Sequence, residues 1–178
     1  MHEKYFDLSF DGICIYINIA VKNPLLGKIA LVLAELFILV VFFIAVINWI
    51  PGLVLMSFFF LLLLMKYSLW NFFGQENLII NTKTISYRYD YGFFRTTRVT
   101  KKLSKPVFLH YENCDVIDDE FMVKLQLISN DKDDLPEIIY QFALPVSLQE
   151  AQQIDSLIRQ ISIQKVTDDY SLPDINLN

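Results

Sequence analysis

Glycine, cysteine and histidine are scarce in this chain of 178 residues, which contains five, two and two of them. The glycines do not cluster, so a glycine-rich phosphate-binding loop is excluded, and neither a GxSxG nor an HExxH motif is present. Cys14 and Cys114 lie far apart and form no CxxC unit. Two histidines are too few for a zinc site with the usual ligand spacing. The sequence offers no catalytic constellation, and we expect neither an enzyme nor a bound cofactor.

Two small groups of reactive side chains remain, and each has a plain interpretation. His110 and Cys114 lie four residues apart, which suits either a nucleophile pair or a coincidence at a strand end; we favour the coincidence. An acidic cluster consists of Asp115, Asp118, Asp119 and Glu120. It lacks the glycine and the ligand spacing of an EF-hand loop, so we interpret it as a solvated turn rather than a Ca²⁺ site.

Charge is almost missing from residues 29–65, where Glu35 is the only charged side chain. The first part, residues 29–50, is long enough to cross a hydrocarbon core of about 30 Å as a helix. Pro51-Gly52 predicts a turn, and residues 53–73 predict a second apolar helix that runs back. A signal peptide is not favoured, because a long, mostly polar or alternating stretch comes first and no small-residue cleavage site follows.

Lysine and arginine flank these apolar segments, whereas the turn between them has none. The flanking residues are Lys4, Lys22, Lys28, Lys66, Lys83 and Arg88. The positive-inside rule then predicts that both termini are cytoplasmic. Trp49, Tyr67 and Trp70 lie where an interfacial aromatic belt is expected.

Glu35 and Lys66 are the charged residues within the two apolar segments. If the chain turns about residues 50–51, they lie at the same depth, and an ion pair between them is the simplest explanation for charges that are costly in hydrocarbon. Two alternatives stay open. Glu35 could carry protons or ions in an oligomeric channel, or it could form a salt bridge with a helix of a partner subunit.

Short alternating segments on both sides of the apolar region predict β-strands. Before it, Phe6, Leu8 and Phe10 are followed by Asp11-Gly12 and then by alternating isoleucines, which is the pattern of a β-hairpin. After it, strands are predicted at 78–81, 85–91, 93–100, 106–111, 121–128 and 137–144. The segment from Ser147 to Glu150 is a capping box. It begins a helix with an apolar stripe made of Leu148, Ala151, Ile154, Ile158 and Ile161.

The chain is therefore expected to be an α+β membrane protein in four parts. These are an N-terminal β-hairpin (1–25), a two-helix transmembrane hairpin (26–73), an antiparallel β domain closed by a C-terminal amphipathic helix (74–163) and an acidic tail (164–178). The tail from residue 166 has no periodicity and is expected to be extended.

Three segments resemble bacterial pleckstrin-homology-like (PH-like) domains that follow a two-helix membrane hairpin. They are FGQE (73–76), LIINTKTISYRYDYGFFRTTR (78–98) and LPVSLQEAQQIDSLIRQ (144–160). The resemblance implies an antiparallel, barrel-like β domain closed by one C-terminal helix, on the cytoplasmic side of a bacterial inner membrane. The N-terminal β-hairpin is not part of an ordinary PH module, so its place in the sheet is an open question.

Basic residues gather between positions 83 and 105, which hold seven lysines and arginines against one acid, Asp90. Six of them form what we call the basic stripe: Arg88, Arg95, Arg98, Lys101, Lys102 and Lys105. A basic surface close to a membrane anchor can contact anionic lipid, although a solvated strand surface would show the same pattern. Nucleic acid is not an expected partner, because the net charge is −5 and the period-two aromatics suit a sheet core.

These observations favour a non-enzymatic, membrane-anchored interaction module. It would be an accessory subunit or scaffold that holds a protein partner at the cytoplasmic face. Recognition of anionic lipid or a small ligand by the basic stripe is the first alternative. An oligomeric channel or transport subunit that uses Glu35 is the second. The expected partners are membrane lipid and either another protein or further copies of the chain.

Overall fold

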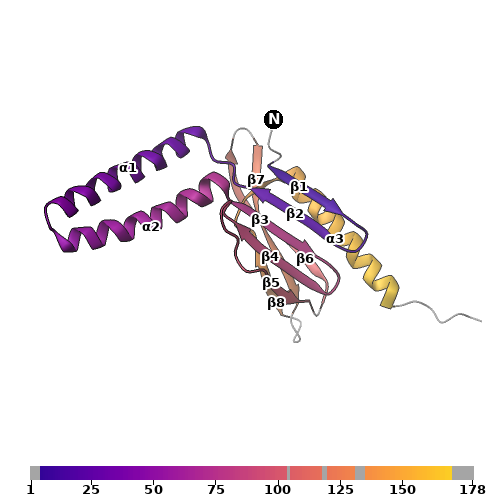
Figure 1. Cartoon of the computed structure of the whole chain (residues 1–178). Coiled ribbons are helices and arrows are strands. Elements are labelled where there is room, and N and C mark those ends of the chain that lie inside the picture. Colours follow the sequence, from indigo (N-terminus) through magenta and orange to yellow (C-terminus); the bar gives the residue numbers. More distant parts are fainter. Residues whose placement is uncertain (1–4, 104, 118–119, 131–134, 170–178) are drawn as a thin grey trace, which may run out of the picture. The chain divides into compact units, whose positions relative to one another are not determined.

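The computed structural model describes residues 5–103, 105–117, 120–130 and 135–169, without the side chains of 113–120 and 164–169. The chain forms two compact units (Figure 1). The β unit comprises Met1–Ile19, Glu76–Arg88 and Thr97–Asn178, and the hairpin unit comprises Ala20–Gln75 and Tyr89–Thr96. The chain thus combines two long apolar helices with open antiparallel sheets, which confirms the predicted α+β architecture at this level.

A five-stranded antiparallel sheet includes the N-terminal strands. Its strands follow the chain order: β1 (Phe6–Phe10), β2 (Ile15–Ala20), β3 (Gln75–Ile80), β4 (Thr84–Asp90) and β5 (Val99–Lys102). The Asp11 carboxylate begins the β1–β2 turn by accepting hydrogen bonds from the N–H groups of Ile13 and Cys14, at 2.9 and 2.7 Å, and Gly12 supplies the positive φ of 92° that the turn requires. The open question is answered, because β2 pairs with β3 across the helical insertion.

A four-stranded sheet forms the other β layer. It contains β6 (Val107–Ile117), β7 (Glu120–Asn130), β8 (Pro136–Gln141) and β9 (Val146–Ser147), in the order β6-β7-β8 with β9 also paired to β7. β6 and β7 are longer than predicted, and the backbone of 115–117 belongs to β6 rather than to a turn. Asp118 and Asp119 of the predicted acidic turn lie outside the described residues.

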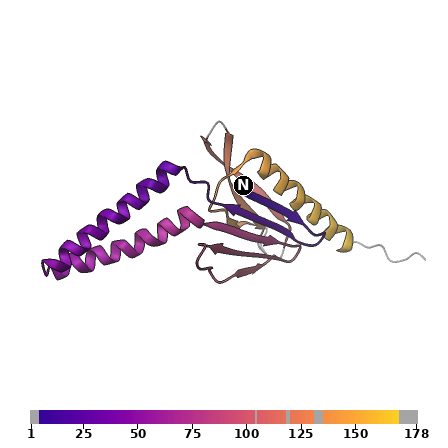
Figure 2. The ribbon, with the colours of Figure 1, turned by 45° about the horizontal axis from the view of Figure 1, so that its top comes forward.

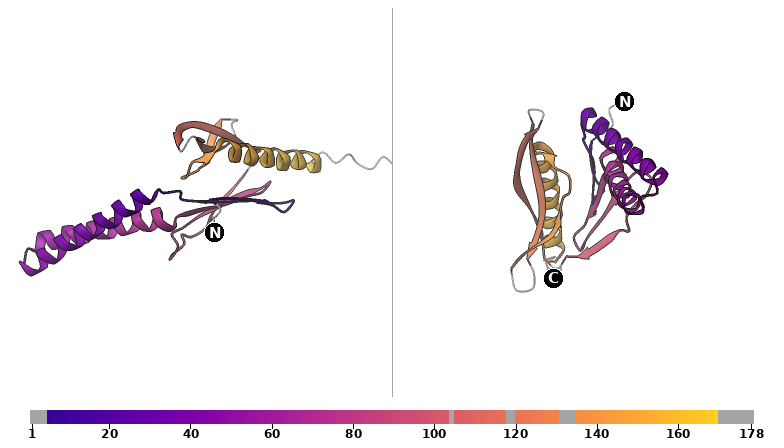
Figure 3. Two further views of the ribbon diagram at one scale, coloured as in Figure 1. Left: turned by 90° about the horizontal axis from the view of Figure 1, so that it is seen from above. Right: turned by 90° about the vertical axis from the view of Figure 1, so that its left-hand side faces the viewer.

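Helix α3 (Leu148–Asp169) packs against both sheets, touching β1, β6, β7 and β9 (Figure 3). The capping box is confirmed: the Ser147 N–H donates to Glu150 Oε2 at 2.9 Å and the Glu150 N–H donates to Ser147 Oγ at 3.3 Å. Four of the five residues of the predicted stripe are buried, and Leu148 is exposed. The helix continues to Asp169, whereas the tail was expected to be extended from residue 166 on.

The hairpin unit is built on α1 (Leu25–Ile47) and α2 (Pro51–Phe73), which run side by side (Figure 2). Each has 23 residues and is long and apolar enough to cross a membrane, and only 6% and 11% of their most apolar windows are buried in the protein. The predicted turn at Pro51-Gly52 is wrong by a few residues: the chain turns at residues 48–50, with Trp49 at a φ of 54°, and Pro51 begins α2. The first helical turn tolerates proline because its N–H would have no partner there.

The predicted strand at 93–100 is wrong in its first half. The continuous ladder with β4 begins at Val99. Before it, Arg95 forms an isolated bridge with Asp90, the Thr96 N–H donates to the carbonyl oxygen of Tyr89 at 2.9 Å, and residues 91–94 form the turn between the strands. Within it, Phe93 and Phe94 contact other aromatic rings, those of Phe73 and Tyr91, with centroids 5.5 and 4.5 Å apart. Aromatic packing at the end of α2 thus competes with strand pairing for these residues.

Candidate ligand-binding site

The outer face of the five-stranded sheet carries polar side chains, because successive residues of a strand point to opposite faces. Ile15, Ile17 and Ile19 of β2 are buried, whereas Tyr16 and Asn18 between them are not. The neighbouring strands show the same alternation: Leu78 and Ile80 are buried on β3, and Asn77 is only half-buried. Polar residues of β1 to β4 therefore gather on one surface of the β unit.

A pocket of about 270 Å³ lies on this face. Two arginines, Arg88 from β4 and Arg98 from the segment before β5, line it together with polar residues of β1, β2 and β3. The polar lining residues besides the arginines are Asp7, Tyr16, Asn18 and Asn77, and Ile17, Leu78 and Ile79 complete the wall. The sheet thus brings together two cations and two amides that are distant in the sequence.

Two polar atoms in this pocket stand out because they are buried and have no hydrogen-bond partner among the described residues. They are Nε of Arg88, which is a donor, and Oδ1 of Asn18, which is an acceptor. Both residues line the same pocket. Leaving a buried polar group unpaired costs about 1–3 kcal/mol. A bound group that accepts from Arg88 and donates to Asn18 would satisfy both atoms.

The rim of the pocket is held by a turn. Tyr16 donates its hydroxyl hydrogen to Oδ2 of Asp11 at 2.9 Å. The N–H groups of Cys14 and Ile13, and then the Tyr16 hydroxyl, hold the pKa of Asp11 below its usual range. The same hydrogen bond, followed by the charge of Asp11, raises the pKa of Tyr16. Asp11 therefore stays ionised and fixes the Tyr16 ring.

The structure divides the predicted basic stripe. Only Arg88 and Arg98 line the pocket. Arg95 pairs with Asp90, with Nε 2.6 Å from Oδ2, and Lys101 donates from Nζ to the carbonyl oxygen of Ile139 at 2.7 Å. Lys102 is exposed on β5, while Lys105 interacts within the protein and lines a different, much smaller cavity. The six cations do not form one surface.

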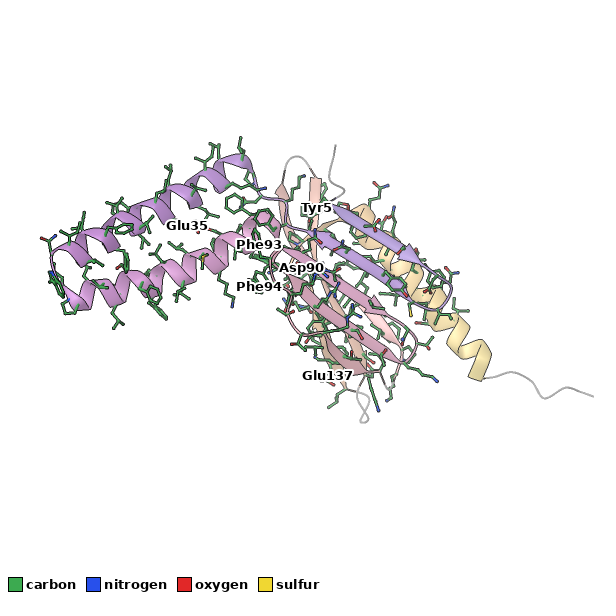
Figure 4. All side chains as sticks on the ribbon, in the orientation of Figure 1. Tyr5, Glu35, Asp90, Phe93, Phe94 and Glu137 are labelled. Atoms are coloured by element: carbon green, nitrogen blue, oxygen red, sulfur yellow. The ribbon has the colours of Figure 1, made fainter. Side chains whose placement is uncertain are left out.

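The predicted ion pair between Glu35 and Lys66 does not form within the described chain. Glu35 lies on the side of α1 that faces α2 (Figure 4), yet its Oε1 is buried with no hydrogen-bond partner among the described residues. The α2 residues that face α1 include Leu64 and Ser68, which are half-buried and buried. Lys66 lies two residues from each, about 160° around the helix, and is exposed. Equal depth was considered in the prediction, but helical phase was not.

An aromatic cluster surrounds the end of α2 within the hairpin unit. The Trp70 ring contacts those of Tyr89 and Tyr91, with centroids 5.7 and 5.1 Å apart. Phe93 and Phe94 follow in the loop and are 79% and 45% exposed (Figure 4). Rings of this kind at a helix end suit the boundary between lipid and water.

Other places in the described chain offer less chemistry. A groove of about 590 Å³ near the hairpin turn is lined by apolar side chains from α1, α2 and the turn. No group of three or more His, Cys, Asp or Glu residues in the described part of the chain is placed to hold a metal ion. His110 is exposed, and the side chain of Cys114 lies outside the described residues.

Sequence reasoning found Arg88 and Arg98 but missed Asn18, Asn77 and Tyr16. The available signal was their position: each stands between two residues of a strand that are buried, which are isoleucines for Tyr16 and Asn18 and Glu76 and Leu78 for Asn77, and so belongs to the polar face of the strand. No protein-family model and no curated protein sequence matches the chain, so the site rests on its own geometry.

Proposed function

We propose that the chain is a non-enzymatic, membrane-anchored binding module that recognises an anionic ligand in the Arg88/Arg98 pocket. α1 and α2 would cross a bacterial inner membrane as a hairpin, with both termini cytoplasmic. The low burial of the helices supports insertion, because a soluble protein rarely exposes so much contiguous apolar surface. The positive residues that flank the hairpin support the orientation.

The β unit in this proposal is a PH-like domain. Two antiparallel sheets and a C-terminal helix that contacts both support this assignment. The N-terminal β-hairpin would be an addition to it, since it extends the first sheet beyond β3.

The observation that carries the proposed activity is the buried Nε of Arg88, which has no hydrogen-bond partner in the described part of the chain and lies in the same pocket as Arg98. Arginine is suited to phosphate and carboxylate, because its planar donors match their oxygens. Oδ1 of Asn18 adds an acceptor for a ligand hydroxyl. Asp7 also lines the pocket and already interacts within the protein, which limits the space for negative charge. A single phosphate group with a neighbouring hydroxyl fits this set best.

Such a group could belong to a phospholipid headgroup or to a soluble phosphate compound, and a titration separates the two. Full-length protein in neutral detergent is titrated by calorimetry with inorganic phosphate, with dihexanoyl-phosphatidylglycerol and with dihexanoyl-phosphatidylcholine. Phosphatidylglycerol binding that exceeds both other probes indicates a lipid headgroup, and comparable binding of inorganic phosphate indicates a soluble ligand. Binding of neither phosphate nor phosphatidylglycerol would contradict the proposal.

Variants show whether the pocket is responsible. Arg88→Gln is expected to weaken binding about 10- to 100-fold, because a hydrogen bond to a charged group contributes about 1.5–3 kcal/mol. Lys102→Gln is the matched control, because Lys102 is a cation of the same sheet that does not line the pocket. Equal losses in the two variants would show that only general electrostatic attraction is present.

Membrane insertion is tested separately. The protein should stay in the pellet after alkaline carbonate extraction of membranes. Two variants each carry a single cysteine, at Trp49 in the turn or at Ser156 in α3. An impermeant maleimide added to intact spheroplasts should label the cysteine at position 49 but not the one at position 156. Release by carbonate, or the reverse labelling, would contradict the proposed placement.

A second candidate function, docking of a protein partner, rests on the outer face of the four-stranded sheet. Phe108, Ile128 and Ile138 are cross-strand neighbours there, and Phe108 and Ile138 are 60% and 51% exposed. A partner recovered with the wild type, lost with Phe108→Ser/Ile138→Ser and kept with Arg88→Gln would favour this function. Equal recovery with all three proteins would exclude this face.

A further inference from the structure

Glu35 is poorly placed for a residue of an apolar helix. It lies ten residues after Leu25 and twelve before Ile47, near the middle of α1, so its carboxyl group cannot reach either end of the helix. Its Oε1 is buried and has no hydrogen-bond partner among the described residues. If the hairpin is in a membrane, as proposed above, this acid is in the hydrocarbon region, where an unpaired ionisable group is costly and usually functional.

Lys66, in contrast to Glu35, is an exposed charge on an apolar helix. It is exposed on the face of α2 that points away from α1, and no ion pair joins it to another residue in the described part of the chain. Lysine near a helix end can extend its amine toward the interface, which would relieve Lys66 but leave Glu35 unpaired. An explanation that serves both residues is preferable.

The two residues lie at similar depth. The rings of Phe42 and Phe58 contact each other across the hairpin, with centroids 6.5 Å apart, and fix the register of the helices. Glu35 is seven residues from Phe42, and Lys66 is eight residues from Phe58, in the same direction along the hairpin axis. The difference of one residue corresponds to about 1.5 Å. The pair therefore matches in depth and in charge but not in phase within one chain.

We propose that the hairpins of two copies associate, and that Glu35 of one copy, which is only half-buried against its own α2, pairs with Lys66 of the second copy. The charge complementarity lies within the chain itself, since Glu35 and Lys66 are the two charged residues of positions 29–73. A second copy presents the same lysine, at the same depth, on an exposed helix face. Parallel insertion in one membrane keeps Glu35 and Lys66 of the two copies at the same depth. Because the two residues lie on different sides of the hairpin, the contact joins one face of the first copy to a different face of the second.

Cross-linking between differently tagged copies tests this pairing. Both copies carry Cys14→Ser and Cys114→Ser; one also carries Glu35→Cys and the other Lys66→Cys. A short bis-methanethiosulfonate reagent in native membranes should give a product that contains both tags. Leu55→Cys in place of Lys66→Cys is the control, because Leu55 is exposed on α2, on the same face as Lys66 but about three turns nearer the hairpin turn. Equal yields with both partners would overturn the proposal.

Charge reversal provides the second readout. Glu35→Lys and Lys66→Glu should each reduce the fraction of associated protein at least tenfold, and the double variant should restore it. Loss in the double variant would overturn the pairing. So would a reagent product that forms only within one chain carrying both cysteines.

The failure of this inference is distinguishable from failure of membrane insertion. Every sample is first extracted with alkaline carbonate. Protein that remains in the membrane but gives no two-tag product contradicts the Glu35–Lys66 pairing alone. Protein released by carbonate contradicts the proposed anchor itself, and with it the basis of the pairing.

Discussion

The carboxylate of Glu76, on β3, accepts a hydrogen bond from the hydroxyl of Tyr140, on β8. It also accepts from the backbone N–H groups of Ala143, at 3.1 Å, and Leu144, at 3.2 Å. Glu76 is 1% exposed, and β3 and β8 belong to different sheets. A single buried carboxylate thus joins the two sheets of the β unit, and every one of these contacts is a donor to it.

Burial raises the pKa of Glu76, while the hydrogen bonds from Tyr140, Ala143 and Leu144 oppose the rise. The pKa of Glu76 in the folded state thus lies above its ordinary value of 4.5. Glu76 therefore contributes stability that is fully present below pH 4.5 and is lost as the pH rises through the pKa of the folded state. Glu76→Gln should therefore flatten the decrease in unfolding free energy between pH 4.5 and neutrality. Chemical unfolding of the full chain in detergent, followed by near-UV circular dichroism at several pH values, measures it.

Glu137→Gln is the control for this prediction, because Glu137 is an exposed carboxylate on β8 (Figure 4). It should leave the pH dependence of stability unchanged. If Glu76→Gln and the wild type show the same dependence of unfolding free energy on pH, the pKa of Glu76 does not differ between the folded and unfolded states, and the prediction is wrong.

Gly92 is expected to be intolerant of a side chain for two reasons. Its φ is 83°, and an added Cβ would lie 2.7 Å from Cβ of Phe73. Gly92→Ala should therefore destabilise the loop against α2 by about 2–4 kcal/mol, combining backbone strain with a clash. Gly12→Ala separates the two causes, because Gly12 has a φ of 92° but open space around it. Its cost should be about 1–2 kcal/mol; equal thermal shifts for both variants would contradict the clash.

Ser147 should stabilise α3 because its hydroxyl oxygen caps the first turn of the helix. Ser147→Ala removes the acceptor for the Glu150 N–H and is expected to cost about 1 kcal/mol of stability. Ser156→Ala, on the exposed face of the same helix, should change stability by less than about 0.5 kcal/mol. Urea unfolding midpoints of the two variants compare these values directly.

Local features of the fold could be predicted from sequence because each depends on a few neighbouring residues. The β1–β2 hairpin follows from the turn that begins at Asp11, and the start of α3 follows from the pairing of Ser147 with Glu150. The apolar helices follow from composition over a long window. In each case the determining contacts span fewer than five residues or repeat along one element.

Features that depend on distant residues were out of reach. The pairing of β2 with β3 joins segments separated by both apolar helices. The pocket needs Asn18, Asn77 and Arg88 on one surface, and only the strand order shows that they meet. The predicted Glu35–Lys66 ion pair within one chain shows the same limit. The depth of Lys66 can be counted along the sequence, but the direction in which it points around the helix axis depends on which face of α2 packs against α1.

The most direct test of the Arg88/Arg98 pocket is the thermal unfolding of the full-length protein in neutral detergent, with inorganic phosphate or chloride at equal ionic strength. A ligand that binds only the folded state stabilises it in proportion to the logarithm of its concentration over Kd. Phosphate should raise the Tm of the wild type and of Lys102→Gln, and leave that of Arg88→Gln unchanged. An equal rise in all three proteins, or no rise in the wild type with either inorganic phosphate or dihexanoyl-phosphatidylglycerol, would contradict the account.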